Sequence, residues 1–301
     1  MFNGCKSLLE TSELPTLILA ERCYQNMFSE CSSLVSAPEL PAENLAPHCY
    51  ELMFSNCTSL VNAPELPATT LSEYCYQNMF RGCTSLTSTP ELPATISKYG
   101  CYKSMFTNCT SLINTYDIPF TVLAGECLMA MFRHCTSLVT APKIYATTIG
   151  SYSCLSMFNE CTSLLNAPDL YATELKHQCY YAMFMNCTSL EIAPKIYATS
   201  IPSNASECCR EMFSGCSSLI EAPELLSSTL SNSCYRQMFQ GCTSLIESSE
   251  LSATILAPYC YYGMFENCSS LINASELTAT TLADACYMYM FSNCTSLTKS
   301  P

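Results

Sequence analysis

The sequence repeats itself every 26 residues, and this period constrains the fold more than any other feature. A Met-Phe pair marks each copy, and successive pairs are 26 residues apart except between Met183 and Met212, where the interval is 29. The twelve methionines are Met1, Met27, Met53, Met79, Met105, Met131, Met157, Met183, Met212, Met238, Met264 and Met290. Units of this length cannot bury an apolar face alone and fold by stacking on their neighbours. The period therefore predicts an elongated solenoid of about twelve repeats.

The stretch before each Met-Phe pair is predicted to be a short helix. In the copy SEYCYQNMFRGC, Cys75, Met79 and Cys83 are four residues apart. The same spacing separates Tyr76 from Phe80. Two adjacent stripes with this spacing make one broad apolar face on a helix. The residue before the second Cys is mostly Gly or Asn, which tolerate the left-handed backbone at the end of a helix.

An extended segment is predicted to follow. A Ser-Leu pair comes after the second Cys in every copy, and an apolar stretch such as residues 61–66 comes next. Each copy is expected to contribute one strand to a parallel sheet, with the helices on the opposite face. Proline lacks a backbone donor, so Pro64, Pro90 and Pro142 predict strands that are short or bulged.

The unit Phe-x-x-Cys-[Ser/Thr]-Ser-Leu, followed by an extended stretch with proline, resembles the BspA-type leucine-rich repeat across the whole chain. Cys-Tyr-x-x-Met-Phe stands where many members have Ala-Phe. The resemblance implies an α/β leucine-rich-repeat solenoid, with a parallel β-sheet on one face and short helices on the other. It also implies an adhesion protein on a bacterial or protist surface, with no catalytic residues.

Residues 1–301 are expected to form a single repeat domain. Stacked repeats need polar terminal caps, and the sequence has none at either end. The chain is therefore expected to be a fragment of a longer one, in which a missing signal peptide carries little weight. A cell-surface or extracellular location is implied by the resemblance alone.

Composition excludes several classes of function. Half of the residues are hydrophobic (49%) and few are charged (12%), which is typical of a packed chain rather than a disordered one. The net charge of −13 disfavours binding to nucleic acid or anionic lipid. No run of 18 apolar residues indicates membrane insertion.

The 24 cysteines follow the repeat. Twelve stand four residues after the Met, and the others mostly four before it, with Cys154 displaced by one and Cys208-Cys209 doubled. We expect most of them to be buried, unpaired thiols that pack as small hydrophobic side chains. A disulfide ladder between stacked copies is the alternative, because neighbouring copies approach bonding distance.

No cofactor, metal site or enzyme activity is expected. Zinc sites use clustered Cys-x-x-Cys spacings, and this chain has none. His48, His134 and His177 do not have the spacing of a metal site or of a catalytic pair.

The candidate binding site comes from positions where the copies differ. The position twelve residues after the Met is charged, and the position two further on is Pro in the first five copies. Three consecutive copies replace this Pro by Tyr, and two of them replace the acidic residue by Lys. They carry Lys143, Asp169 and Lys195 beside Tyr145, Tyr171 and Tyr197.

Residues two apart in an extended segment share a side, so these six residues are expected to form one patch. The one insertion, around residues 201–204, follows and is expected to add a wall to it. The alternative is a block of repeats that drifted together, with Tyr covering an apolar edge.

The leading functional hypothesis is a non-enzymatic recognition or adhesion surface that binds a host protein, peptide or glycan. A structural spacer or stalk that displays another domain on a cell or phage is the alternative. A thiol-rich metal or redox scaffold is the third. The distinct Tyr and Lys block favours the first hypothesis, because a spacer has no use for one special patch.

Overall fold

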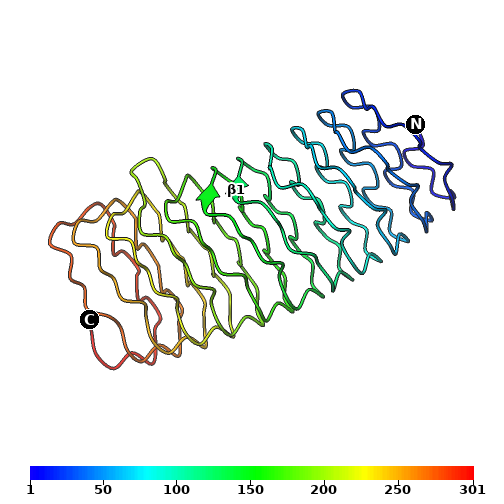
Figure 1. Cartoon of the computed structure of the whole chain (residues 1–301). Helices are drawn as coiled ribbons and strands as arrows, with labels where there is room; N and C mark the ends of the chain where they lie inside the picture. Colours follow the sequence, from blue (N-terminus) through cyan, green and yellow to red (C-terminus); the bar gives the residue numbers. More distant parts are fainter.

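The computed structural model describes all 301 residues as a stack of coils, one for each repeat. A coil here is the segment from one Met-Phe pair to the next. Figure 1 shows the coils following one another in chain order along a gently curved axis, with the two termini at opposite ends. The predicted repeat solenoid is confirmed.

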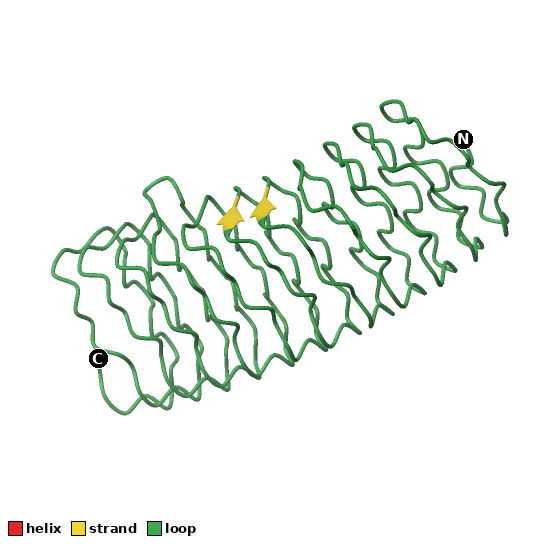
Figure 2. Ribbon diagram, viewed as in Figure 1, coloured by secondary structure: helices red, strands yellow, loops and turns green.

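Parallel pairing between coils is present, but only in short pieces. Strand β1 (Val122–Leu123) pairs in parallel with β2 (Thr148–Ile149), and both are visible in Figure 2. Elsewhere single residues form parallel bridges, as in the row Ser36, Asn62 and Ser88. Proline lies between two such rows in many coils, so the ladder is interrupted as predicted. The expected continuous sheet is replaced by rows of single bridges.

The predicted helices are absent, and this part of the expected fold is wrong. Residues 74–83 and their equivalents, the turn segment of each coil, form a chain of β-turns. Alternate amides close these turns: Gln77 N donates to Tyr74 O (3.1 Å), and Met79 N donates to Tyr76 O (3.1 Å). An α-helix would use carbonyls four residues back. Because half of the amides bond to another coil, no helical ladder can form.

Those remaining amides join each coil to the next. Tyr76 N donates to Cys101 O (3.1 Å), Asn78 N to Lys103 O (2.9 Å) and Phe80 N to Met105 O (2.9 Å). In every turn segment the donors belong to the earlier coil and the acceptors to the later one. These bonds satisfy the turn backbone without a helix.

A left-handed residue recurs at every fourth position of the turn segment. In one coil these residues are Tyr74 (φ 54°), Asn78 (φ 55°) and Gly82 (φ 73°). At Gly82 a Cβ would also meet Oδ1 of Asn56, whose side chain would have to move aside. His134 and Glu160 adopt the same conformation at this repeat position (φ 61° and 63°). The strain of about 1–2 kcal/mol per residue is offset where the left-handed N–H bonds to the next coil.

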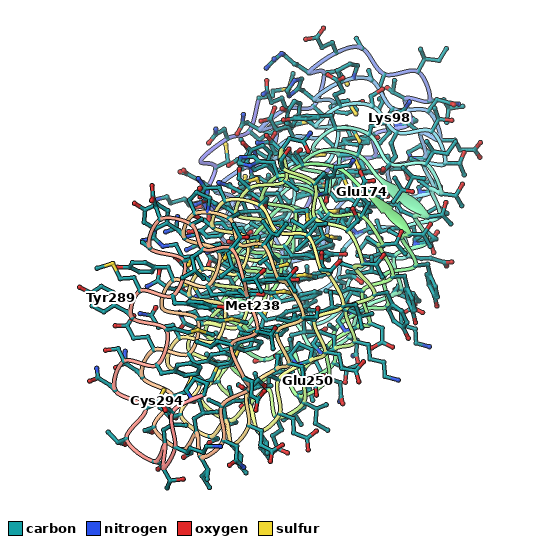
Figure 3. All side chains as sticks on the ribbon, turned by 90° about the vertical axis from the view of Figure 1, so that its left-hand side faces the viewer. Lys98, Glu174, Met238, Glu250, Tyr289 and Cys294 are labelled. Carbon is teal, nitrogen blue, oxygen red and sulfur yellow. The ribbon has the colours of Figure 1, made fainter.

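Phenylalanine forms an uninterrupted stack through the core. Each Met-Phe pair contributes one ring, and adjacent ring centroids are 5.4–5.7 Å apart with interplanar angles of 2–9°. In Figure 3 Met238 is labelled among the packed interior side chains, and Tyr289 lies at the outer edge. One hydrophobic cluster of 85 buried residues runs from Met27 to Met290.

A second, tyrosine column stands three residues before the Met and has gaps. Leu128 replaces Tyr in one coil, and Phe120 stands where neighbouring coils have Ala. The Phe120 ring stacks on Tyr102 at 5.4 Å and 18°. Phe120 therefore takes the place of the missing tyrosine ring.

Cys154 is not a displaced member of its cysteine column, as the sequence suggested. Its N–H donates to Cys179 O (3.0 Å), the bond that Tyr76 makes to Cys101 in another coil. Cys209 makes the equivalent bond to Cys234 O (2.9 Å). Both cysteines thus occupy the tyrosine column. Ser153 takes the vacant cysteine position. Its carbonyl accepts the N–H of Leu128 (2.9 Å), as the carbonyl of Cys101 accepts that of Tyr76.

Candidate functional site

The six predicted site residues lie on one strip across three consecutive coils. Ile144, Leu170 and Ile196 are buried, and each is flanked by one charged residue and one Tyr of the predicted patch. Parallel bridges at this row join Ile118 to Ile144 and Leu170 to Ile196. The expected alternation of inward and outward side chains is therefore present here.

Three tyrosine side chains form an exposed row, which we call the tyrosine row. Tyr145, Tyr171 and Tyr197 are 44%, 41% and 39% exposed. The rings of Tyr171 and Tyr197 stack at 5.3 Å with an interplanar angle of 25°. Leu226, at the same position of the following coil, extends the row and is also exposed.

Two aspartates tie the backbone of this strip together. Asp117 accepts the N–H of Lys143 and the hydroxyl of Tyr145 (3.0 and 2.8 Å). Asp169 accepts the N–H of Lys195 (3.0 Å) in the same way. The hydrogen bond to Asp117 raises the pKa of Tyr145, so this hydroxyl remains protonated at neutral pH.

The two lysines form no ion pair in the structure. Their neighbouring aspartates bond to backbone groups instead, which leaves both ammonium groups unpaired. Along the column, basic and acidic residues alternate from Asp117 to Glu224. The patch is a local interruption in an otherwise acidic column.

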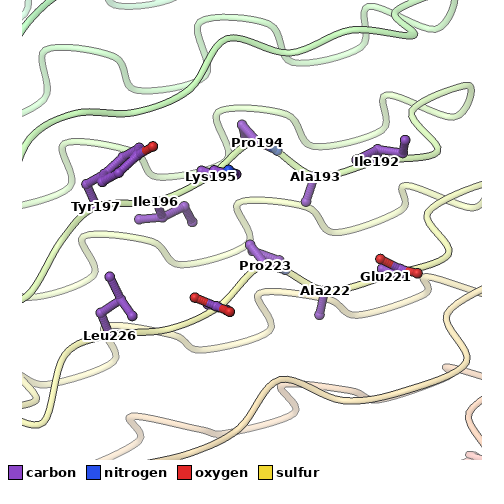
Figure 4. A pocket seen from close by; sticks show the side chains of 11 residues that line it. Ile192, Ala193, Pro194, Lys195, Ile196, Tyr197, Glu221, Ala222, Pro223 and Leu226 are labelled. Carbon is purple, nitrogen blue, oxygen red and sulfur yellow. The ribbon is translucent and has the colours of Figure 1, made fainter.

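A groove with a volume of about 420 Å³ lies beside the C-terminal end of the tyrosine row. Figure 4 shows Tyr197 beside Leu226 at one end, Ile192 and Glu221 at the other, and Lys195 between them. Of the six predicted residues, Lys195 and Tyr197 line this groove and the other four do not.

Sequence reasoning missed the contribution of the following coil to this groove. Leu226 and Glu224 occupy the repeat positions of Tyr197 and Lys195. Because they hold the same repeat positions in the next coil, the sequence could have placed Leu226 and Glu224 beside the predicted patch.

The insertion does not form the expected wall. Ile201 holds the repeat position of Leu123 in β1, residues 202–204 follow it, and Figure 1 shows a loop projecting from that edge. Ser203 and Asn204 are exposed, but no residue of the insertion lines the groove. The groove is bounded by Ile192 and Glu221 on the opposite side.

Burial of the cysteines is confirmed. Only Cys5 and Cys23 are exposed and Cys294 is half-buried, and all 24 thiols are free in the structure. From Cys31 onward, each thiol that follows the Met by four residues donates to a Phe carbonyl of the preceding coil, at 3.0–3.2 Å. Burial raises the pKa of Cys161 and Cys216 to about 12. The structure has no group of three or more His, Cys, Asp or Glu residues placed to hold a metal ion.

Alkylation should distinguish these thiols. At mildly alkaline pH, Cys5 and Cys23 are expected to react quickly in the native protein, Cys294 more slowly and the rest negligibly, because a buried thiol with a raised pKa yields little thiolate. After denaturation without reductant all 24 should react, as counted by mass spectrometry. Fewer than half of the 24 reacting then would mean a disulfide ladder between coils.

Two solved structures are similar to this chain. A leucine-rich repeat protein from Bacteroides ovatus ATCC 8483 gives a TM-score of 0.49 at 20% identity, covering 93% of this chain and 76% of that one. A leucine rich cell surface protein from Faecalibacterium prausnitzii A2-165 gives a TM-score of 0.37 at 18% identity, covering 83% and 75%. No family model and no curated protein matches the sequence. The structure contains no helix that could span a membrane.

Proposed function

We propose that this chain is a non-enzymatic recognition module that binds a peptide, protein or glycan through the tyrosine row and its flanking charges. The observation that carries the proposal is three exposed Tyr rings side by side on consecutive coils. Tyr combines a flat apolar face with a hydrogen-bonding tip at low cost in conformational entropy, which is why recognition surfaces favour it. An extended segment or a short run of sugar rings suits such a row.

The charges around the row favour a ligand with an anionic group. The unpaired ammonium groups of Lys143 and Lys195 lie within a protein of net charge −13, where a carboxylate or sulfate has few other places to dock. The same net charge disfavours nucleic acid. The groove is lined by Lys195, Tyr197 and Leu226, so a ligand there can make an apolar contact with Leu226 next to the charge of Lys195.

A cell-surface or extracellular location is part of this proposal and rests on the resemblance of the repeat unit. The alternative function is a structural spacer, which the unbroken phenylalanine stack through every coil favours. A spacer needs stiffness but no specific patch, so the two functions predict different results for variants of the tyrosine row.

The test is the triple variant Tyr145→Ser, Tyr171→Ser and Tyr197→Ser, applied to a glycan array and a random peptide library. Ser is already tolerated at this repeat position, at Ser252. The wild-type protein should select ligands, and the triple variant should bind them at least tenfold more weakly, equivalent to about 1.4 kcal/mol. Melting temperature should change little, because these side chains are exposed.

A matched control replaces three exposed tyrosines outside the patch, Tyr99, Tyr259 and Tyr289, with Ser. This control should bind the selected ligands like the wild type. Equal binding by both triple variants, or no selected ligand at all, would reject the recognition site and favour the spacer.

A further inference from the structure

An exposed row of aliphatic side chains runs along a different strip of the solenoid. It stands eight residues after the Met, and nine of the first eleven coils carry Val, Leu or Ile there, each 39–62% exposed. We call it the aliphatic row: Leu9, Val35, Val61, Ile113, Val139, Leu165, Ile220, Ile246 and Ile272. It is broken twice, by Thr87 and by Glu191.

Backbone hydrogen bonds hold this row in register. Leu165 N donates to Val139 O (2.9 Å), and Ile272 N donates to Ile246 O (3.0 Å). At the Thr87 break bonds run on both sides, from Thr87 N to Val61 O (3.4 Å) and from Ile113 N to Thr87 O (3.0 Å). At the Glu191 break one bond joins the coils, from Ile220 N to Glu191 O (3.1 Å). Neighbouring side chains are therefore separated by the strand spacing of roughly 4.8 Å.

The surface beside the row is polar but uncharged over half of the molecule. From the coil of Met27 to the coil of Met157, the positions five, six and nine residues after the Met hold only Ser, Thr and Asn. Some of these hydroxyls bond to the preceding coil, as Thr58 does to Ser32 O (3.3 Å). In a protein of net charge −13, a second copy meets no like charge at these positions.

The size of the row matches that of a stable contact. Nine side chains with this exposure present on the order of 700 Å², against roughly 800 Å² per partner in a standard-size interface. The row is thus large enough to be an interface by itself.

The two breaks make the row symmetric about its middle. Thr87 lies two coils before Val139 and Glu191 lies two coils after it, with three aliphatic residues between the breaks and three beyond each. If the order of the row is reversed about Val139, each aliphatic residue falls on another aliphatic residue, and Thr87 and Glu191 exchange places. A two-fold interface requires this self-complementarity, because residue i must meet residue j while j meets i.

We propose that two copies of this chain pair face to face along the aliphatic row, antiparallel, with the two-fold axis at Val139. Val139 then meets its own copy, and Ile113 meets Leu165. At each break the Thr87 hydroxyl donates to the Glu191 carboxylate of the partner. Farther out, Val61, Val35 and Leu9 meet Ile220, Ile246 and Ile272.

Other ways of pairing two copies along this row bring Glu191 against an unfavourable partner. In the two-fold pair that keeps the coil order, Glu191 faces Glu191, and like charges repel. A shift by one coil in either direction sets Glu191 against an aliphatic residue, Val61 or Ile113. The proposed register also sets Glu221 and Glu247, which stand one residue beyond the row, opposite Asn62 and Ser36 rather than opposite acids.

The first test is the mass in solution, measured by analytical ultracentrifugation over a wide range of concentration. The wild-type protein should be a dimer that dissociates on dilution. Val139→Glu places two carboxylates against each other at the axis and should raise the dimer dissociation constant at least tenfold. The control Ile255→Glu changes another exposed aliphatic residue (66%, against 39% for Val139) outside the row and should leave the constant unchanged.

The second test examines the register. Thr87→Glu sets two new carboxylates against Glu191 and should weaken the dimer. Adding Glu191→Lys should restore it, because Glu then meets Lys at both breaks. A wild-type monomer at every concentration, a dimer insensitive to Val139→Glu, or a failed rescue would each overturn the proposal. The triple tyrosine variant should still dimerise, so this interface is tested independently of the recognition patch.

Discussion

Replacing Phe158 with Ala is expected to lower the free energy of unfolding by about 3–5 kcal/mol. Its ring is fully buried and stacks on Phe132 at 5.6 Å and on Phe184 at 5.5 Å. The substitution leaves a cavity in the middle of the phenylalanine stack and removes two aromatic contacts of about 0.5–1.5 kcal/mol each. Because repeat stability is a sum of nearest-neighbour terms, the loss falls on both flanking coils.

Urea unfolding followed by circular dichroism measures this loss. Phe291→Ala is the matched control: it holds the same repeat position, but it is half-buried and stacks on Phe265 alone. Its cost should be clearly smaller. Equal costs for the two substitutions would show that the central stack contributes no more than an ordinary surface contact.

Phe120→Ala is expected to have an effect of similar size, about 3–5 kcal/mol, for a different reason. Neighbouring coils pair a small Ala with a large Tyr, as Ala94 and Tyr102 do, whereas this coil pairs Phe120 with Leu128. Removing the Phe120 ring uncovers one side of Tyr102, which keeps only its contact with Tyr76 on the other side. The coil then has Ala and Leu at these two positions, whereas the preceding coil has Ala94 with the ring of Tyr102.

The double variant Phe120→Ala with Leu128→Tyr should recover most of the lost stability, because it recreates the Ala and Tyr pair of the adjacent coil. Leu128→Tyr alone should cost about 1–3 kcal/mol by overpacking against Phe120. Chemical denaturation of the three variants gives the coupling energy. Additive losses would mean that the two side chains do not share one space.

The solenoid was predictable because its period is longer than any single secondary element and recurs through the whole chain. It was predictable that the residues on either side of Ile144, Leu170 and Ile196 share one side, since residues two apart face one way in extended chain. Which side faces the core could not be predicted from the sequence. Burial of the thiols followed from their fixed distance to the Met.

The helix could not be told from the chain of turns, because both place equivalent side chains four residues apart. The turns need a left-handed residue at every fourth position, but Leu52, Tyr74 and His134 adopt it and give no signal in the sequence. Contacts with the next coil, rather than local preference, decide the backbone here.

The candidate site was predictable only within single coils. The tyrosine row followed from one repeat position, whereas the groove depends on Leu226 and Glu221 of the following coil. The aliphatic row was overlooked because apolar residues in an extended segment suggest burial, and its exposure is visible only in the structure.

The one-way hydrogen bonds of the turn segments give the stack an axial polarity. Five N–H groups of each coil point toward the C-terminal end, so their peptide dipoles add as they do along a helix, but with the positive pole at that end. At the turn segments, any cap or further coil must therefore offer acceptors to the C-terminal end and donors to the N-terminal end, whereas the bonds of the aliphatic row run the opposite way. When two solenoids lie side by side and antiparallel, the positive pole of each lies next to the negative pole of the other. Dipoles in this arrangement attract each other.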